Sequence, residues 1–573
     1  LDERLDLELD MQMREKILAE ALSFGEKAIK IFSRAGVEHE LARAYCITGI
    51  HCFNAAESLQ LGTKRRECEQ KTFDYAKEAI RISESTRDKF LIGKSTFCLG
   101  FAEAELGAGS EVAFELFKKA LQYGIKTKDH RILSETFDGL AYSALVTMLI
   151  EEDLEKLREK SRKSEEYAHE AIGYSILADY GRGIPHSYSL GYVWNLEELA
   201  RREIELEKRH KLLEKAVALG KQGLEHAQRT GSTHAIFHIS WQLAHALYDL
   251  STVETGVEKS RLLEEAITLG EKAVYYTEQL RPSFTMSHAL PYEALALTLF
   301  ELSRLEERRD KRQELLEKSV SRMETCITLL QRHMTSFPSR RELFAMLARF
   351  QTELGDILNQ LYQITGEKEI PRKLIEAYQS AAEMNRKAEL ASRAAEVYWQ
   401  TAVAFNRLDE YLESASNFEH ASKQYELSAH HIPQLSSFYM DYATYMQAWS
   451  NIERARHSHE REEYGQSKEH YEKAASALKS SKSWNYLAQN YLAWVHLEHA
   501  EDLSRNDKSQ EAIQAFTEAA KLFKQAKESL EAESSKILSP DEKDIAAKVS
   551  KASDLREEYC LARILIEEAK NLY

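Results

Sequence analysis

The sequence has few of the residues that break helices. Its 573 residues include only 7 prolines and 22 glycines. No alternating run of β-branched residues is followed by a hairpin turn. Few breakers together with abundant Ala, Leu, Glu and Lys predict helix through nearly the whole chain. Because single hydrophobic cores stop growing well below this length, we expect an all-α chain that is either several domains or one elongated array.

Several signatures are also lacking, and each absence disfavours a class of function. The 6 cysteines include no CxxC pair, which favours buried thiols in a reducing compartment over a disulfide framework. No apolar run approaches the roughly 20 residues of a membrane span, and no signal peptide is recognisable. The phosphate-binding loop, GxSxG and HExxH are missing. We therefore expect a cytoplasmic protein that does not act on membranes, is not an enzyme and has no cofactor.

The balance of charge along the sequence limits the kinds of partner that the protein could bind. A net charge of −16 disfavours nucleic acid, since phosphate binding needs a basic stripe. The basic run at 308–312 has acidic neighbours and is interpreted as a solvated helix face. Acidic pairs such as Glu197-Glu198 are interpreted in the same way, as solvated surface. His496 and His499 lie one helical turn apart, but a structural zinc site needs further ligands nearby, so we expect no metal.

What the sequence does contain is a repeated spacing. Two small or medium-sized residues stand seven apart eleven times, at intervals of 40 to 55 residues. A periodic array of this kind is typical of a solenoid. The pairs are Ala21/Ala28, Thr72/Ala79, Ala113/Ala120, Ser164/Ala171, Ala216/Gly223, Ala266/Ala273, Ser319/Cys326, Leu374/Ala381, Ser414/Ala421, Ser467/Ala474 and Ala512/Ala519.

The best unit shows how the spacing works. Ala512, Phe516 and Ala519 fall on one face of a helix, so that the small residues admit a neighbouring helix and the aromatic ring fills the space between them. This unit resembles the second helix of a tetratricopeptide repeat (TPR). The resemblance extends along essentially the whole chain and is strongest from about Leu374 to Leu530.

The resemblance implies a right-handed superhelical α-solenoid of about eleven antiparallel helix pairs. It also implies a concave face, lined by the first helix of each pair, that binds a protein or peptide. The intervals here exceed the family's usual repeat of about 34 residues, which predicts longer helices or longer loops. Three units carry glycine in place of the aromatic residue, namely Gly25, Gly220 and Gly270. We interpret these glycines as close helix crossings, with the floor of an open groove as the alternative.

The repeat signal is weakest between Pro282 and Pro371. We therefore expect N-terminal repeats over 1–330, a possible joint over 331–371 and C-terminal repeats over 372–573. We also suspect that the chain is part of a longer protein, because it begins with Leu1 and stops inside an expected helix.

Two groups of residues are candidates for partner binding. Arginines near the expected joint could clamp an acidic peptide terminus. The stretch 172–194 is rich in glycine and aromatic residues, and either forms a binding patch at a helix start or, as we prefer, an inter-helix loop with core tyrosines. The candidates are Arg340, Arg341, Arg349 and Arg372 in the first group and Tyr180, Arg182, Tyr188 and Tyr192 in the second.

These observations support three functions to different degrees. The leading hypothesis is a non-catalytic interaction scaffold, or the sensor arm of a larger regulated protein. The alternative is a self-assembling structural protein, because the last helix offers Leu561 and Leu565 with no following unit. An independent enzyme is the least supported. The sequence does not identify the partner, because fold alone does not fix function.

Overall fold

The computed structural model describes residues 11–58, 63–107, 109–181, 183–279, 286–335, 340–534 and 540–570. Within these ranges the protein is all-α and contains no strand. None of the described helices combines the length and the apolar character that crossing a bilayer requires. The contacts between residues divide the chain into a first unit, residues 1–370, and a second unit, residues 371–573.

The helices of the first unit follow one another with short connections. They are α2 (Met11–Ala35), α3 (Glu38–Ser58), α4 (Thr63–Ser85), α5 (Lys89–Leu106), α6 (Ser110–Thr127), α7 (His130–Met148), α8 (Leu154–Leu177), α9 (Gly183–Ser187), the π-helix η1 (Tyr188–Trp194), α10 (Asn195–Ala200), α11 (Leu206–Thr230), α12 (Thr233–Ser251), α13 (Gly256–Gln279), α14 (Met286–Leu305), α15 (Arg309–Met334) and α16 (Arg341–Thr365).

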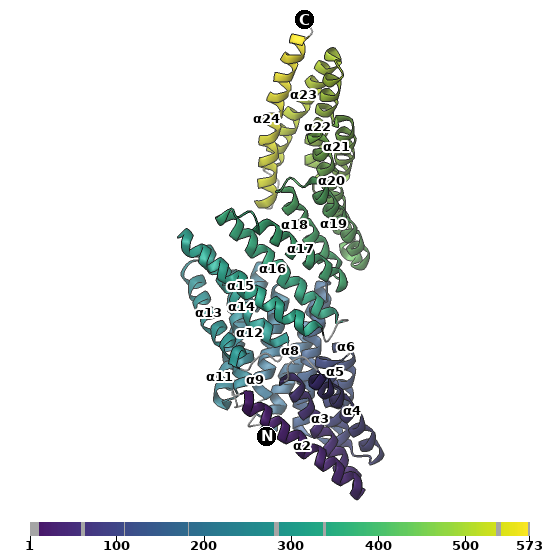
Figure 1. The fold of residues 1–573 in the computed structure, drawn as a ribbon, viewed down its shortest axis with the longest axis vertical. Coiled ribbons are helices and arrows are strands. Elements are labelled where there is room, and N and C mark those ends of the chain that lie inside the picture. Colours follow the sequence, from purple (N-terminus) through teal and green to yellow (C-terminus); the bar gives the residue numbers. More distant parts are fainter. Residues whose placement is uncertain are drawn as a thin grey trace. The chain divides into compact units, whose positions relative to one another are not determined.

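The second unit continues in the same style. It contains α17 (Ile370–Lys387), α18 (Ala391–Asn406), α19 (Tyr411–His431), the 3-10 helix η2 (Pro433–Leu435), α20 (Ser436–Glu460), α21 (Tyr464–Ser480), the 3-10 helix η3 (Asn485–Leu487), α22 (Ala488–Arg505), α23 (Ser509–Ser534) and α24 (Pro540–Lys570). In both units each helix packs mainly on the next one along the chain, as α23 and α24 do in Figure 1.

The eleven spaced pairs lie on eleven separate helices, which alternate with helices that lack the spacing. Every paired position is buried except Ala28, which is half-buried. The expected fold class, an all-α array of TPR-like helix pairs, is thereby confirmed. The hand of the superhelix and the number of pairs stay predictions.

Phe117 of α6 shows what the spacing achieves. Its ring is fully buried. A Cβ atom added to Gly100 of α5 or to Gly139 of α7 would lie only 2.9 Å and 2.7 Å from that ring. The ring therefore fits between the two flanking helices only because both present glycine where they meet it.

Serine at the first position of a pair adds a polar contact to this packing. Each such serine donates a hydrogen bond from its Oγ to a backbone carbonyl oxygen of the preceding non-motif helix, which satisfies a buried hydroxyl. The bonds run from Ser164 to Ala141 (3.1 Å), Ser319 to Ala296 (2.7 Å), Ser414 to Ala402 (2.9 Å) and Ser467 to Ala455 (3.0 Å).

The three glycines that replace the aromatic residue differ in how much space surrounds them. A Cβ on Gly25 would lie 2.3 Å from Oγ1 of the buried Thr48, and one on Gly220 would lie 2.9 Å from a methyl carbon of Leu243. A Cβ on Gly270 would meet Leu295 only at 3.6 Å, an ordinary contact. The predicted close crossing is therefore confirmed at Gly25 and Gly220, whereas Gly270 has room for a side chain.

This difference predicts that replacing each glycine by alanine changes the free energy of unfolding in opposite directions. We expect Gly25→Ala to lower the free energy of unfolding by about 1–3 kcal/mol, because the new methyl group displaces Thr48. We expect Gly270→Ala to raise it by about 0.5–1 kcal/mol, because alanine favours a helix interior more than glycine does. Thermal unfolding of both variants beside the parent chain measures the two shifts. Equal shifts of the same sign would contradict the assignment of these two sites.

Candidate functional site

A cavity of about 900 Å³ lies in the first unit among consecutive helix pairs. We call it the α3–α12 cavity, because α3, α5, α7, α9 and α12 supply most of its wall, with further residues from α4 and the loops before α9 and α12. Its volume is at the upper end of the range for sites that hold a small ligand or a few peptide residues.

The wall contributed by α3 and α5 is aromatic. Phe53 meets Phe101 edge to face with ring centroids 5.0 Å apart, and Phe97 stacks on Phe101 at 6.2 Å. All three rings line the cavity, and Phe97 and Phe101 are only partly buried. This part of the wall is suited to covering an apolar side chain of a ligand.

The wall contributed by α5 and α7 is charged. The Lys94 ammonium pairs with the Glu135 carboxylate, and the Arg131 Nε donates a 3.2 Å hydrogen bond to the same carboxylate. Burial alone would lower the pKa of Lys94, but the adjacent Glu135 and the two nearby cysteines together raise it. The Arg131 guanidinium also lies over the Tyr180 ring, 4.6 Å from its centroid. This pairing gives the middle of the cavity fixed donors and acceptors.

The wall contributed by α9 and α12 is rich in histidine. His234 and His238 are one turn apart on α12, with ring centroids separated by 4.4 Å, and His186 of α9 pairs with Asp138 of α7. Ser187 donates a 2.8 Å hydrogen bond to Asp138 and helps to hold its carboxylate. Burial and the neighbouring imidazoles lower the pKa of His238. His238 therefore stays neutral and offers one donor and one acceptor.

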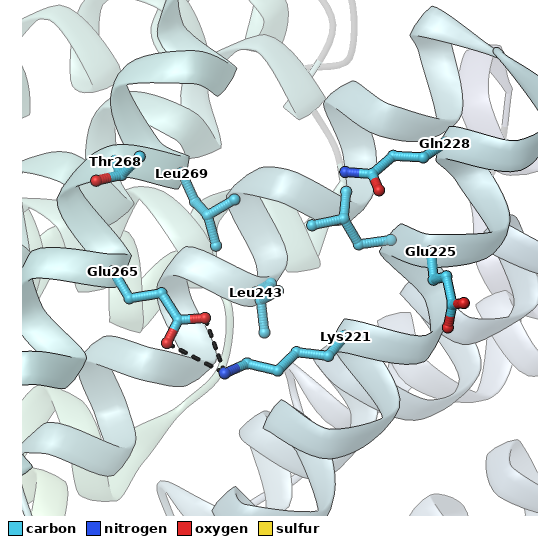
Figure 2. Close-up of a pocket in the computed structure, with 8 residues that line it drawn as sticks. Lys221, Glu225, Gln228, Leu243, Glu265, Thr268 and Leu269 are labelled. Atoms are coloured by element: carbon cyan, nitrogen blue, oxygen red, sulfur yellow. Dashed lines mark hydrogen bonds and ion pairs between the residues drawn. The ribbon is translucent and has the colours of Figure 1, made fainter.

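A smaller hollow, of about 300 Å³, lies between α11 and α13. Figure 2 shows Lys221 of α11 reaching Glu265 of α13, with a Nζ–Oε1 distance of 2.8 Å, and Leu243 of α12 between the two helices. The ion pair already joins the two helices, and the hollow has about a third of the volume of the α3–α12 cavity. We regard it as a seam between packed helices.

A buried network of charges joins α10, α12, α14 and α16 in the same unit. Arg201 pairs with Glu197 at 2.7 Å and with Asp249 at 2.9 Å. Arg349 of α16 pairs at 2.8 Å both with Glu198 of α10, 151 residues away, and with Glu293 of α14. The interpretation of Glu197-Glu198 as solvated surface is wrong, because both glutamates are buried in this network.

His245 is a protonated member of this network. Its Nδ1 lies 2.6 Å from Glu197, and its Nε2 lies 3.4 Å from Glu293. Burial opposes the charged imidazolium, but the two carboxylates outweigh burial and raise the pKa of His245 to about 10. Glu197, His245 and Asp249 also place ligand atoms within 4.8 Å of one another. Since Arg201 already bridges both carboxylates, this arrangement favours an ion-pair network over a metal site.

Glu353 of α16 gives this network a pH dependence. Burial, and then repulsion from Glu293, raise the pKa of Glu353 from 4.5 to about 8. The folded state therefore keeps a proton that the unfolded chain has lost. The resulting stability is fully present below pH 4.5 and is lost as the pH rises through about 8.

We expect Glu353→Gln to remove this loss, because the amide is uncharged at every pH. At about pH 5 the variant should match the parent chain, and at about pH 8 it should be more stable by roughly 1–3 kcal/mol. Urea unfolding of the full chain, monitored by hydrogen exchange in peptides from the first unit, measures this difference in the free energy of unfolding. The matched control is Glu225→Gln on the exposed face of α11, whose exposed pair with Arg229 should contribute less than about 1 kcal/mol. A difference for Glu353→Gln that does not grow with pH would contradict the prediction.

Three of the four arginines predicted from the sequence form ion pairs with different glutamates. Arg340 is buried and its guanidinium pairs with Glu342 at 2.7 Å, whereas Arg349 belongs to the charge network. Arg341 begins α16, and Arg372 pairs with Glu410 within the second unit. A shared clamp formed by these arginines therefore stays a prediction.

The tyrosines predicted from the stretch 172–194 are divided between two surroundings. Tyr180 lines the α3–α12 cavity, and burial raises its pKa. Tyr188 stacks on His226 with centroids 5.8 Å apart, and Tyr192 follows it on η1. Arg182 lies outside the described residues. The preferred interpretation of a loop is wrong for residues 183–194, which are helical and end in the π-helix η1.

Apart from Tyr180, the residues that make up the cavity wall were not among the candidates from the sequence. For one part of the wall, the spacing of two cysteines in the sequence was an available signal. Cys46 and Cys98 are 52 residues apart, close to the 51-residue interval between Ala21 and Thr72. This interval would have placed the two cysteines at equivalent positions of adjacent helix pairs. No comparable spacing in the sequence indicates that His186 lies near His234 and His238.

Comparisons with known proteins give likenesses of fold. No family model matches the chain, and no curated protein matches it. Among solved structures, a Rap protein complexed with competence and sporulation factor is 14% identical, with 72% of this chain and 98% of that chain covered and a TM-score of 0.36. A STAND ATPase with a tetratricopeptide repeat sensor from Pyrococcus horikoshii is 12% identical, with 93% and 90% covered and a TM-score of 0.29. IFIT1 with m7Gppp-AAAA is 11% identical, with 83% and 95% covered and a TM-score of 0.30.

At these identities and TM-scores the likenesses concern the general kind of fold and carry no functional argument. The alternating helices and their buried spaced residues define the class directly. The protein is a TPR-like helical repeat protein, and its first unit contains a cavity lined by consecutive helix pairs.

Proposed function

We propose that this protein is a non-catalytic scaffold that binds an extended protein or peptide segment in the α3–α12 cavity. The observation that carries the proposal is the composition of the wall. Aromatic rings, fixed charges and histidines follow one another along helices α3, α5, α7 and α12. An extended segment could place an apolar side chain on Phe101 and polar groups near Asp138 and His238, which would read side chains at several successive positions.

A selection from a random peptide library displayed on phage tests this proposal with the full chain as bait. We expect enriched peptides with an apolar residue, and we expect Phe101→Arg to weaken their binding at least tenfold, because the guanidinium would stand where the apolar side chain packs. The control is Phe114→Arg on α6, a partly buried aromatic residue that does not line the cavity. Peptides that bind Phe101→Arg as tightly as the parent chain would overturn the assignment to this cavity.

The predicted arginine group is a weaker candidate for the same function. Arg349 and Arg340 already form ion pairs with buried glutamates, so recruiting them for a ligand would leave those carboxylates unpaired. We retain the proposal that the repeats act as the sensor arm of a larger regulated protein, in which peptide binding at the α3–α12 cavity would be the sensed event.

Self-association is the second candidate function. The side chains of Leu561 and Leu565 on α24 are 51% and 67% exposed, whereas Cys560 and Ile564 of the same helix pack against α22 and α23. Sedimentation velocity over a range of concentrations distinguishes the two candidates, because a monomer at all concentrations would leave only the scaffold.

A further inference from the structure

Two cysteine side chains meet at the contact between α3 and α5. The Sγ atoms of Cys46 and Cys98 are 3.8 Å apart, although the residues are 52 positions apart in the sequence. Cys46 is buried, whereas Cys98 is only partly buried and lines the α3–α12 cavity. The pair therefore combines a shielded thiol with one that small molecules in the cavity can reach.

The distance is short enough for a bond after a small movement. A disulfide needs about 2.05 Å between its sulfurs, so the gap must close by about 1.8 Å, shared between two side chains. α3 and α5 belong to adjacent helix pairs and pack directly on each other. The contact can therefore be closed by rotating two side chains.

The hydrogen bond between the two cysteines favours a thiolate at Cys46. The hydrogen bond from Cys98 is the largest influence that lowers the pKa of Cys46, and the positive charge of Lys94, one turn before Cys98 on α5, acts in the same direction. The pKa of Cys98 is raised by the same hydrogen bond and by burial, so the two sulfurs share one proton. Burial raises the pKa of the other four thiols, Cys52, Cys68, Cys326 and Cys560.

We propose that Cys46 and Cys98 form a modification site at which hydrogen peroxide converts two thiols into a reversible disulfide that joins α3 to α5. Low-pKa cysteines beside a second, resolving cysteine are the usual setting for this chemistry. The proposal rests on the contact between the sulfurs and on access through the cavity, and it does not depend on which ligand the cavity binds.

Hydrogen peroxide oxidises the two thiols in two successive displacements, first at oxygen and then at sulfur. The shared proton first moves from the Cys98 sulfur to the Cys46 sulfur. The Cys98 thiolate then attacks one oxygen of the peroxide, the O–O bond breaks, and the second oxygen leaves as hydroxide and takes the proton from Cys46 to form water. Cys98 is then a sulfenic acid. The Cys46 thiolate attacks its sulfur, the S–O bond breaks, and hydroxide leaves and becomes the second water. Together the two thiols lose two electrons and two protons, and one hydrogen peroxide is reduced to two waters.

Oxidation of the full, folded chain with a small excess of hydrogen peroxide tests the proposal. We expect the free thiols, titrated in denaturant, to fall from the 6 of the sequence to four, because two enter the disulfide. The intact mass should fall by two hydrogens, and dithiothreitol should restore both values. Retention of all six thiols, or oxidation of Cys98 to sulfinic acid without a cross-link, would overturn the proposal.

The cross-link must also be assigned to the correct cysteine. Cys46 and Cys52 fall within one tryptic peptide, because no Lys or Arg lies between them. The mapping is therefore repeated in Cys52→Ser, where the cross-link should persist, and in Cys98→Ser, where it should be lost. Far-UV circular dichroism checks that both variants keep their helix content. A cross-link that disappears in Cys52→Ser would assign the bond to the wrong pair and refute the site.

Discussion

Replacing Arg201 by methionine should lower the free energy of unfolding of the first unit by about 3–5 kcal/mol. The guanidinium forms ion pairs with Glu197 and Asp249, and both carboxylates are buried. Methionine fills a similar volume but leaves two negative charges without their shared partner. The size of the loss reflects the uncompensated buried charges more than the strength of the pairs themselves.

Hydrogen exchange followed by mass spectrometry measures this loss locally, in peptides from α10 and α12. The control is Arg229→Met on α11, whose arginine forms an exposed pair with Glu225 and should contribute less than about 1 kcal/mol. Adding Glu197→Gln and Asp249→Asn to Arg201→Met should recover much of the stability, because the unpaired charges are then removed. A loss of stability for Arg201→Met as small as that for Arg229→Met would contradict the prediction, because it would mean that water already screens the charges of the network.

Phe117→Ala is expected to have an effect of similar size, about 3–5 kcal/mol. The fully buried ring fills the space between Gly100 and Gly139. Neither glycine has a side chain that can move into the vacated volume, so filling it requires a shift of α5 or α7 or of the neighbouring Phe97 ring, whose centroid lies 5.8 Å away. Denaturant unfolding should show the loss, and exchange should rise first in peptides from α5 to α7.

The matched control for this substitution is Phe24→Ala on α2, where the same ring is 62% exposed. Its cost should be below about 1 kcal/mol, because little buried area is lost. A Phe117→Ala variant as stable as Phe24→Ala would mean that the spaced aromatic residues are not needed to hold adjacent helix pairs together.

The architecture could be predicted because it depends on volume at a few periodic positions. Residues such as Ala113 and Ala120 have to be small wherever helices cross, so their spacing in the sequence marks each motif helix. Gly25 and Gly220 follow the same rule, and Gly270 does not, since only the partner helix determines whether a Cβ fits. One helix alone does not contain that information.

The charge network could not be predicted for a related reason. Glu197 and Glu198 look like ordinary surface acids, because the cations that bury them come from elsewhere in the chain. Arg349 is 151 residues from Glu198, and this contact depends on how α10 and α16 are brought together in the folded first unit. The same holds for the α3–α12 cavity, where Asp138 meets His186 only after α7 and α9 have packed. Local periodicity predicts helices and their buried faces, but it does not predict which polar residues face each other.

The serine hydrogen bonds between helices have a consequence for how this protein can diverge. Each of the four serines, such as Ser164, bonds to a backbone carbonyl oxygen, and every amino acid supplies that oxygen. The four acceptors, Ala141, Ala296, Ala402 and Ala455, are fully buried alanines, and none of them lines the α3–α12 cavity. Side chains on the wall of this cavity can therefore change while the hydrogen bonds between helices stay intact, so new ligand preferences can evolve without a new fold.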